Sequence, residues 1–176
     1  MNAGFSGTNW DAAFETDSAK FEFISHAIQA LPDYRSVPAP GDESFYPLIL
    51  IPYDTMRLAS GYIGSPPFMV KALEDTILKG NDVMVEVNPA TAKKFGLSHG
   101  KYAILTTPRG SAKVIINTID GIMPGVAAIP RGLGHTAYDN FLAGKGVSYN
   151  MLNQTVEDPA TGFDAAWGIR AKLSKA

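Results

Sequence analysis

Two arginines and a group of glycines stand in loops after apolar runs, and these residue types are suited to holding phosphate groups. Arg57 and Arg131 lie just beyond the apolar runs 46–53 and 126–129. Proteins bind phosphates with backbone N–H groups in glycine-rich turns and with a nearby cation. Glycine, which has no Cβ atom, lets the backbone approach such a ligand closely. The glycines of this kind are Gly132, Gly134, Gly144 and Gly146.

Polar side chains near the same loops offer the paired donors and acceptors that suit the edge of a ring system rich in nitrogen. These candidates are Tyr53, Asp54, Thr55, Ser60, His135, Asn150 and Asn153. Each has a plainer interpretation. Arg57 fits a surface or interdomain ion pair, and the glycines and asparagines fit ordinary turns. The glycine spacing is not a Rossmann fingerprint, and the three histidines lack the spacing of metal ligands.

Composition narrows the functional classes. The 176 residues suit one domain with its own core, and 45% are hydrophobic while 18% are charged. The formal net charge of −2 includes no basic stripe, so nothing favours nucleic-acid binding. No cysteine is present, which excludes iron–sulfur clusters and a cysteine nucleophile within these residues. The apolar runs are also too short for direct membrane insertion.

The elements that must position these candidates read as short strands. We predict strands over 46–53, 81–88 and 126–129, a strand pair joined by a turn at 108–110, and a last strand over 167–173. The amino-terminal residues 20–25 and 26–31 favour a short strand and a helical turn. We assign residues 1–44 as an extension and linker and 45–176 as the main domain. Six or seven short strands without a βαβ series favour a closed barrel.

Two segments favour helices. Residues 68–78 have helical spacing, and the run 88–96 begins with Asn88 as N-cap and Pro89 at the first helical position, with Gly96 as C-cap. The loop 54–67 is expected to lack regular structure because it is rich in Gly, Ser and Pro.

The central run carries a family resemblance. It reads V-x-V-N-P-x-x-A from Val85, then Gly96-Leu97, Gly100 and the turn Thr107-Pro108-Arg109-Gly110. Met123-Pro124-Gly125-Val126 and the tail from Asn150 to Gly162 follow in the same order. Over residues 46–174 this pattern resembles the C-terminal molybdopterin-dinucleotide-binding domain of the DMSO reductase (molybdopterin oxidoreductase) superfamily. Residues 132–146 are most similar to the polysulfide reductase, menaquinone reductase and alternative complex III subgroup.

The resemblance implies a mainly β fold, a double-psi β-barrel of about six strands with two or three short helices. It implies that the domain cradles molybdopterin guanine dinucleotide for respiratory electron transfer in a prokaryotic oxidoreductase, as in anaerobic respiration. The molybdenum or tungsten would lie outside this chain, and no catalytic or metal-ligating residue is expected within it. The candidates above, Arg57 and Arg131 included, would then contact phosphate, guanine or pterin.

Partners follow from the same resemblance. They are the remaining domains of the parent catalytic subunit, together with Fe–S and membrane quinone-linked subunits, on the periplasmic or cytoplasmic face of a membrane-associated complex. One departure matters: the family's first loop often reads G-R-x-x-x-H, but no histidine follows Arg57. The alternative is therefore a non-catalytic assembly module of a quinone-linked complex with an empty or partial pocket. Self-cleavage at Gly64-Ser65 or Gly110-Ser111 is disfavoured, because turns commonly contain such pairs.

Overall fold

The structure is a computed structural model that describes residues 14, 16, 18, 20–21, 37–61, 68–137, 140–158, 162–165 and 167–176. Residues 37–158 and 162–176 belong to one compact unit. In the amino-terminal unit the described residues are few, and the Thr16 hydroxyl donates to the carbonyl of Lys20 at 2.7 Å. The strand and helical turn predicted over 20–31 lie almost entirely outside the described residues.

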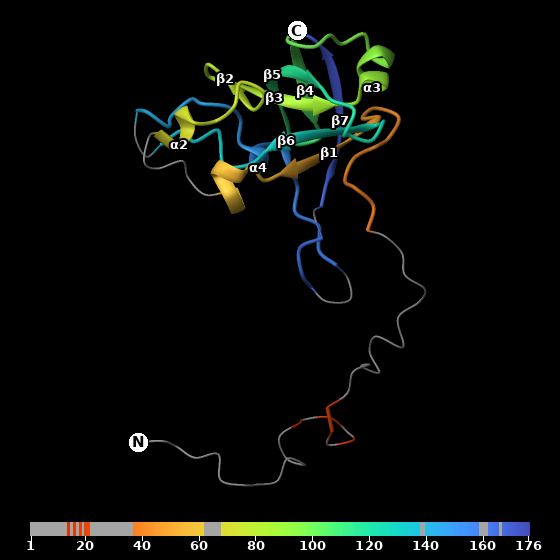
Figure 1. Ribbon diagram of the computed structural model, residues 1–176. Coiled ribbons are helices and arrows are strands. Elements are labelled where there is room, and N and C mark those ends of the chain that lie inside the picture. Colours follow the sequence, from red (N-terminus) through yellow and green to blue (C-terminus); the bar gives the residue numbers. More distant parts are fainter. Residues whose placement is uncertain are drawn as a thin grey trace, which may run out of the picture. The chain divides into compact units, whose positions relative to one another are not determined.

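The compact unit is a closed six-stranded β-barrel (Figure 1). The ring runs β3-β5-β4-β7-β1-β6 and closes because β6 also pairs with β3. Its strands are β1 (Leu48–Tyr53), β3 (Asp82–Val87), β4 (Tyr102–Thr107), β5 (Gly110–Thr118), β6 (Val126–Pro130) and β7 (Ile169–Lys175). The added strand β2 (Leu78–Lys79) pairs with the start of β3.

Two parallel pairs give the barrel its crossed connections. β1 pairs in parallel with β6, and β3 pairs in parallel with β5, while the other ring pairings are antiparallel. Because β3, β4 and β5 lie between β1 and β6 in sequence, the connection that joins the parallel pair β1 and β6 contains the whole of the other parallel pair. The predicted fold class, a double-psi barrel of about six strands with short helices, is confirmed.

Alternating apolar residues fill the barrel, as the period of a half-buried strand requires. The fully buried side chains on β3 are Val83, Val85 and Val87, each 0% exposed. The matching inward positions on the other strands are Leu48, Leu50, Ala103, Leu105, Val114, Ile116, Ala127, Ile129, Ile169, Ala171 and Leu173. One closed core therefore supports both ends of the barrel.

The helices are short: α2 (Phe68–Lys71), α3 (Pro89–Lys94) and α4 (Tyr149–Leu152). The α3 prediction is confirmed at its start, since the Asn88 side chain accepts from the amide of Ala90 at 2.9 Å, but the predicted C-cap, Gly96, is one residue too late. Phe95 occupies the C-cap, and Gly96 follows it with φ 64°. The long helix predicted over 68–78 is wrong. A two-residue turn at Gly80 and Asn81 pairs Lys79 with Asp82, which makes a hairpin of the residues after α2.

The prediction of an irregular loop after β1 is also wrong in part. A 3-10 helix, η2 (Met56–Gly61), begins directly after Thr55. The Thr55 hydroxyl accepts from the amide of Leu58 at 3.1 Å, and the Leu58 side chain is 1% exposed. A capping hydroxyl and one buried leucine thus order a segment whose composition favours irregular structure.

Candidate functional site

The site begins where β1 and β6 end side by side. Tyr53 and Pro130 are partners in the parallel register, and the amide of Arg131 donates to the carbonyl of Tyr53 at 2.9 Å. Because the strands run in the same direction, the residues that follow them emerge at the same end of the barrel. Asp54 and Arg131 are therefore neighbours although 77 positions separate them.

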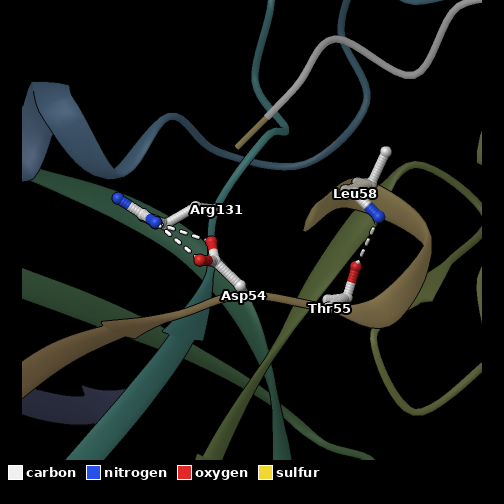
Figure 2. A network of polar contacts seen from close by, with 4 residues as sticks. All are labelled: Asp54, Thr55, Leu58 and Arg131. Carbon is white, nitrogen blue, oxygen red and sulfur yellow. Dashed lines mark hydrogen bonds and ion pairs between the residues drawn. The ribbon is translucent and has the colours of Figure 1, made fainter. Parts of the chain in front are cut away.

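Asp54 and Arg131 form a two-point ion pair (Figure 2). The Arg131 Nε and Nη2 atoms donate to the two carboxylate oxygens of Asp54 at 2.8 and 2.7 Å. These hydrogen bonds raise the pKa of Arg131 above its ordinary value. The two side chains are 43% and 41% exposed, so water and solutes reach the pair.

Tyr53 points to a second carboxylate. Its hydroxyl donates to Oε1 of the half-buried Glu86 on β3 at 3.3 Å. Burial, and then the charge of Glu86, raise the pKa of Tyr53, so its phenol stays protonated at neutral pH. Burial also raises the pKa of Glu86, partly offset by the hydrogen bond from Tyr53. Glu86 was not among the sequence candidates, because alternation on β3 alone makes it an ordinary outward position.

The other candidates of the first loop take different roles. Thr55 is buried and caps η2, whereas Arg57 is exposed on η2 and forms no ion pair within the described ranges. Ser60 also belongs to η2, and its side chain lies outside the described parts. The structure therefore brings Tyr53 and Asp54 to Arg131 and leaves Arg57 facing solvent.

The glycine lobe, residues 131–137 and 140–148, follows β6. Two backbone hydrogen bonds join the two segments of the lobe. The amide of Gly134 donates to the carbonyl of Lys145 at 2.7 Å, and the amide of Gly144 donates to the carbonyl of His135 at 3.0 Å. Gly132 and Gly134 have φ angles of 86° and 79°. A Cβ atom at Gly134 would overlap the backbone of Val147 and Ser148. Close loop-to-loop packing is thus one established reason for glycine here.

Helix α4 continues directly from the glycine lobe. The buried Thr107 hydroxyl at the end of β4 donates to the carbonyl of Leu152 at 2.7 Å and fixes the helix to the barrel. Asn150 is exposed on α4, whereas Asn153, its C-cap, is half-buried. The lobe and α4 together hold His135, Tyr149 and Asn153.

Three buried polar atoms of this region have no hydrogen-bond partner among the described residues: His135 Nε2, Tyr149 Oη and Asn153 Oδ1. Such atoms carry a desolvation cost unless a partner is supplied. Tyr149 is 6% exposed, and its position after the lobe puts it near Arg131, whose positive charge acts on the phenol. Sequence reasoning missed Tyr149, because nothing in the run Ser148-Tyr149-Asn150 indicates that its hydroxyl is buried without a partner.

The donor set fits a ligand with negative charge and several hydrogen-bonding edges. Arg131 offers charge and paired N–H groups, while Tyr149 and Asn153 offer a donor and an acceptor that nothing described satisfies. Gly132 and Gly134, which have positive φ angles, shape the backbone next to Arg131. A nucleotide with phosphates and a purine edge has the complementary groups, so these residues fit the expected cofactor.

A separate cavity lies at the other end of the barrel, where β1 and β6 begin. Its volume is about 290 Å³, and Pro47, Leu48, Ala90, Thr91, Lys94, Phe95, Pro124 and Gly125 line it. Its buried hydroxyl, that of Thr91, already accepts from the amide of Gly125 at 2.9 Å. The unpartnered atoms therefore favour the Arg131 end as the ligand site.

Comparison with known proteins identifies the family. Residues 69–166 match the family model described as "Molydopterin dinucleotide binding domain". The chain belongs to this family. The assignment confirms the predicted recognition, a C-terminal domain of the DMSO reductase family, and the predicted cofactor, molybdopterin guanine dinucleotide with its metal bound by other parts of the protein.

Two curated relatives extend the match beyond the family segment. The menaquinone reductase molybdopterin-binding-like subunit of Nitratidesulfovibrio vulgaris is 33% identical over 74% of the chain and 19% of that protein. The arsenate respiratory reductase molybdopterin-containing subunit ArrA of Shewanella sp. is 26% identical over 92% of the chain and 23% of that protein. The chain thus spans about a fifth of the length of these relatives.

A solved structure supports the fold. Acetylene hydratase from Pelobacter acetylenicus superposes with a TM-score of 0.59 and 22% identity, over 76% of this chain and 19% of that chain. Within the described ranges, no helix is long and apolar enough to cross a bilayer. Nor do three or more His, Cys, Asp or Glu side chains gather there as metal ligands.

Proposed function

We propose that the Arg131 end of the barrel holds the nucleotide part of molybdopterin guanine dinucleotide within a larger respiratory oxidoreductase. The proposal is carried by the Asp54–Arg131 pair at one end of a barrel of this family and by the unpartnered hydroxyl of Tyr149, on which the charge of Arg131 acts. The unpartnered Oδ1 of Asn153 lies at the end of the helix that Tyr149 begins. When bound, the cofactor supplies redox chemistry at its metal, and these residues bind and orient it.

The proposed contacts divide by chemistry. Arg131, the backbone of Gly132, and His135 suit phosphate oxygens, while Asp54 and Asn153 suit guanine or pterin edges. The amide of Gly134 already donates to the carbonyl of Lys145. Tyr53 orients Glu86, and Thr55 holds η2 in place while its hydroxyl proton stays available for donation. Arg57, Ser60 and Asn150 would act at the outer margin, where the rest of the parent subunit supplies the other wall.

The partners in this proposal are the remaining domains of the parent subunit, then Fe–S and quinone-linked subunits on a membrane face. Support comes from the lengths of the relatives, which exceed the aligned segment about fourfold to fivefold. Exposed apolar residues suit such packing: Phe45 is 69% exposed and Trp167 is 84% exposed.

A second candidate is an assembly module of a quinone-linked complex that keeps the barrel with a partial pocket. Two observations favour it: the 33% identical relative is named a molybdopterin-binding-like subunit, and Arg131 is already paired with Asp54. The two candidates differ in whether the Arg131 end binds a nucleotide.

Calorimetric titration of the chain with guanosine diphosphate tests the proposal. Arg131→Met should weaken binding about tenfold, because it removes both charge and paired donors. Arg170→Met is the matched control, since Arg170 forms an ion pair with Glu43 at 2.7 Å on another part of the barrel. Equal loss in both variants, or no nucleotide binding at all, would favour the assembly module.

A further inference from the structure

One edge of the Arg131 guanidinium, formed by Nε and Nη2, is occupied by a carboxylate of the same chain. Two of its nitrogens donate to the two oxygens of Asp54, so its fork is in use (Figure 2). A carboxylate and a phosphate present the same pair of oxygens to such a fork. Any anionic ligand that binds Arg131 through both Nε and Nη2 must therefore compete with Asp54.

The position of the Asp54–Arg131 pair allows a ligand to replace Asp54 as the partner of Arg131. Both side chains are more than 40% exposed, and exposed ion pairs contribute little to stability. The strands beneath it are held by the hydrogen bond from Arg131 N to Tyr53 O. The strands therefore stay joined when the two side chains separate.

Tyr149 supplies the second, independent indication of a ligand. Only 6% of its surface is exposed, yet its hydroxyl has no hydrogen-bond partner in the described part of the chain. Gly134, three residues after Arg131, lies directly against the backbone of Ser148, and this contact sets the position of Tyr149. Burial raises the pKa of Tyr149 to about 12, so the hydroxyl is a neutral donor under ordinary conditions.

We propose that Asp54 is an internal competitor for Arg131, which a phosphate group displaces while accepting a hydrogen bond from the Tyr149 hydroxyl. This inference rests on the proposed function and specifies how the site discriminates. A neutral ring alone cannot open the pair, because it offers no negative charge to replace the carboxylate. The site thereby selects ligands that carry phosphate over nucleosides that lack it.

Titration with inorganic pyrophosphate tests the inference on the whole chain. Asp54→Asn should bind pyrophosphate about fivefold more tightly than wild type, because the competing charge is gone while an isosteric side chain remains. Tyr149→Phe should bind about threefold to tenfold more weakly. In wild type, the Arg131 Nε–H resonance should shift on addition of pyrophosphate and stay unchanged on addition of guanosine.

Glu43→Gln is the matched control, since it removes the carboxylate of the Arg170 pair and one negative charge. Equal tightening in Glu43→Gln and Asp54→Asn would mean a general charge effect and overturn the inference. Asp54→Asn that binds pyrophosphate no tighter than wild type would overturn it as well. If Arg131→Met still weakens the binding of guanosine diphosphate in that case, the proposed function stands and only the competition by Asp54 is wrong. Circular dichroism melts confirm that each variant is folded.

Discussion

Gly134 lies so close to Ser148 that a Cβ atom at position 134 would overlap the Ser148 amide nitrogen. This contact joins the two halves of the glycine lobe and sets where Tyr149 begins α4. It also explains the glycine in physical terms, since φ is 79° at a position with no room for a side chain.

Gly134→Ala should therefore destabilise the domain strongly, by about 3 kcal/mol or more, because backbone atoms must move as well as adopt strain. Gly144→Ala is the matched control. Its φ of 73° is similar, but no atom lies within 4 Å of its added Cβ, so only the backbone penalty of about 1–2 kcal/mol applies. Urea denaturation of both variants measures the difference, and equal losses would contradict the packing argument.

Thr107→Val should loosen α4. The substitution keeps the shape of the side chain but leaves the carbonyl of Leu152 without its 2.7 Å donor. A buried acceptor left unsatisfied costs about 1–3 kcal/mol. Hydrogen exchange should show faster exchange at the amide of Asn153, which donates to the carbonyl of Tyr149 within α4. Thr106→Val, at the neighbouring and less buried position, should leave that rate unchanged.

Tyr149→Phe should leave stability at pH 7 unchanged or raise it by up to about 1 kcal/mol, since it removes a buried hydroxyl without a described partner. The pH dependence has a definite sign. The phenol ionises near pH 10.0 when unfolded and near 12 when folded, so stability is lost as pH rises through that interval. Wild type should lose about 2 kcal/mol there and Tyr149→Phe less. Denaturation at pH 8 and pH 11 checks this, and parallel losses in both proteins would refute it.

Glu86→Gln should stabilise the domain at pH 7. Burial raises the pKa of this carboxyl above 4.5, so its protonated form contributes stability that is lost as pH rises through the folded pKa. Glutamine mimics the protonated form. The gain should be less than about 1 kcal/mol after solvent screening, and it should vanish towards pH 4. Glu157→Gln, at an exposed position, gives the baseline for removing one charge. A gain that persists at pH 4 would argue against the titration of Glu86.

The strands were predictable because their alternation is local. On β3 the inward Val83, Val85 and Val87 repeat every second residue, and this period needs no knowledge of the partner strand. The helix predicted over 68–78 failed because its second half is captured by pairing with β3. Helices η2 and α4 were missed because one capping hydroxyl and one tertiary hydrogen bond hold them, and neither leaves a periodic pattern.

The site was predictable residue by residue but not as an arrangement. Residue type was enough to nominate Asp54 and Arg131, but their contact depends on the parallel register of β1 and β6, which the sequence does not display. Tyr149 could not be predicted, because its residue type alone does not mark it. Its significance lies in a hydroxyl left without a partner, which only a three-dimensional inventory of hydrogen bonds reveals.

The last strand, β7, lies between β4 and β1 rather than beside β5 or β6. Until residues 169–175 have left the ribosome, the other five ring strands form an open sheet with β1 and β4 as unpaired edges. The domain therefore cannot complete its fold during synthesis of its earlier residues. Its nascent chain needs shielding from intermolecular strand pairing until β7 is available to pair with β1 and β4.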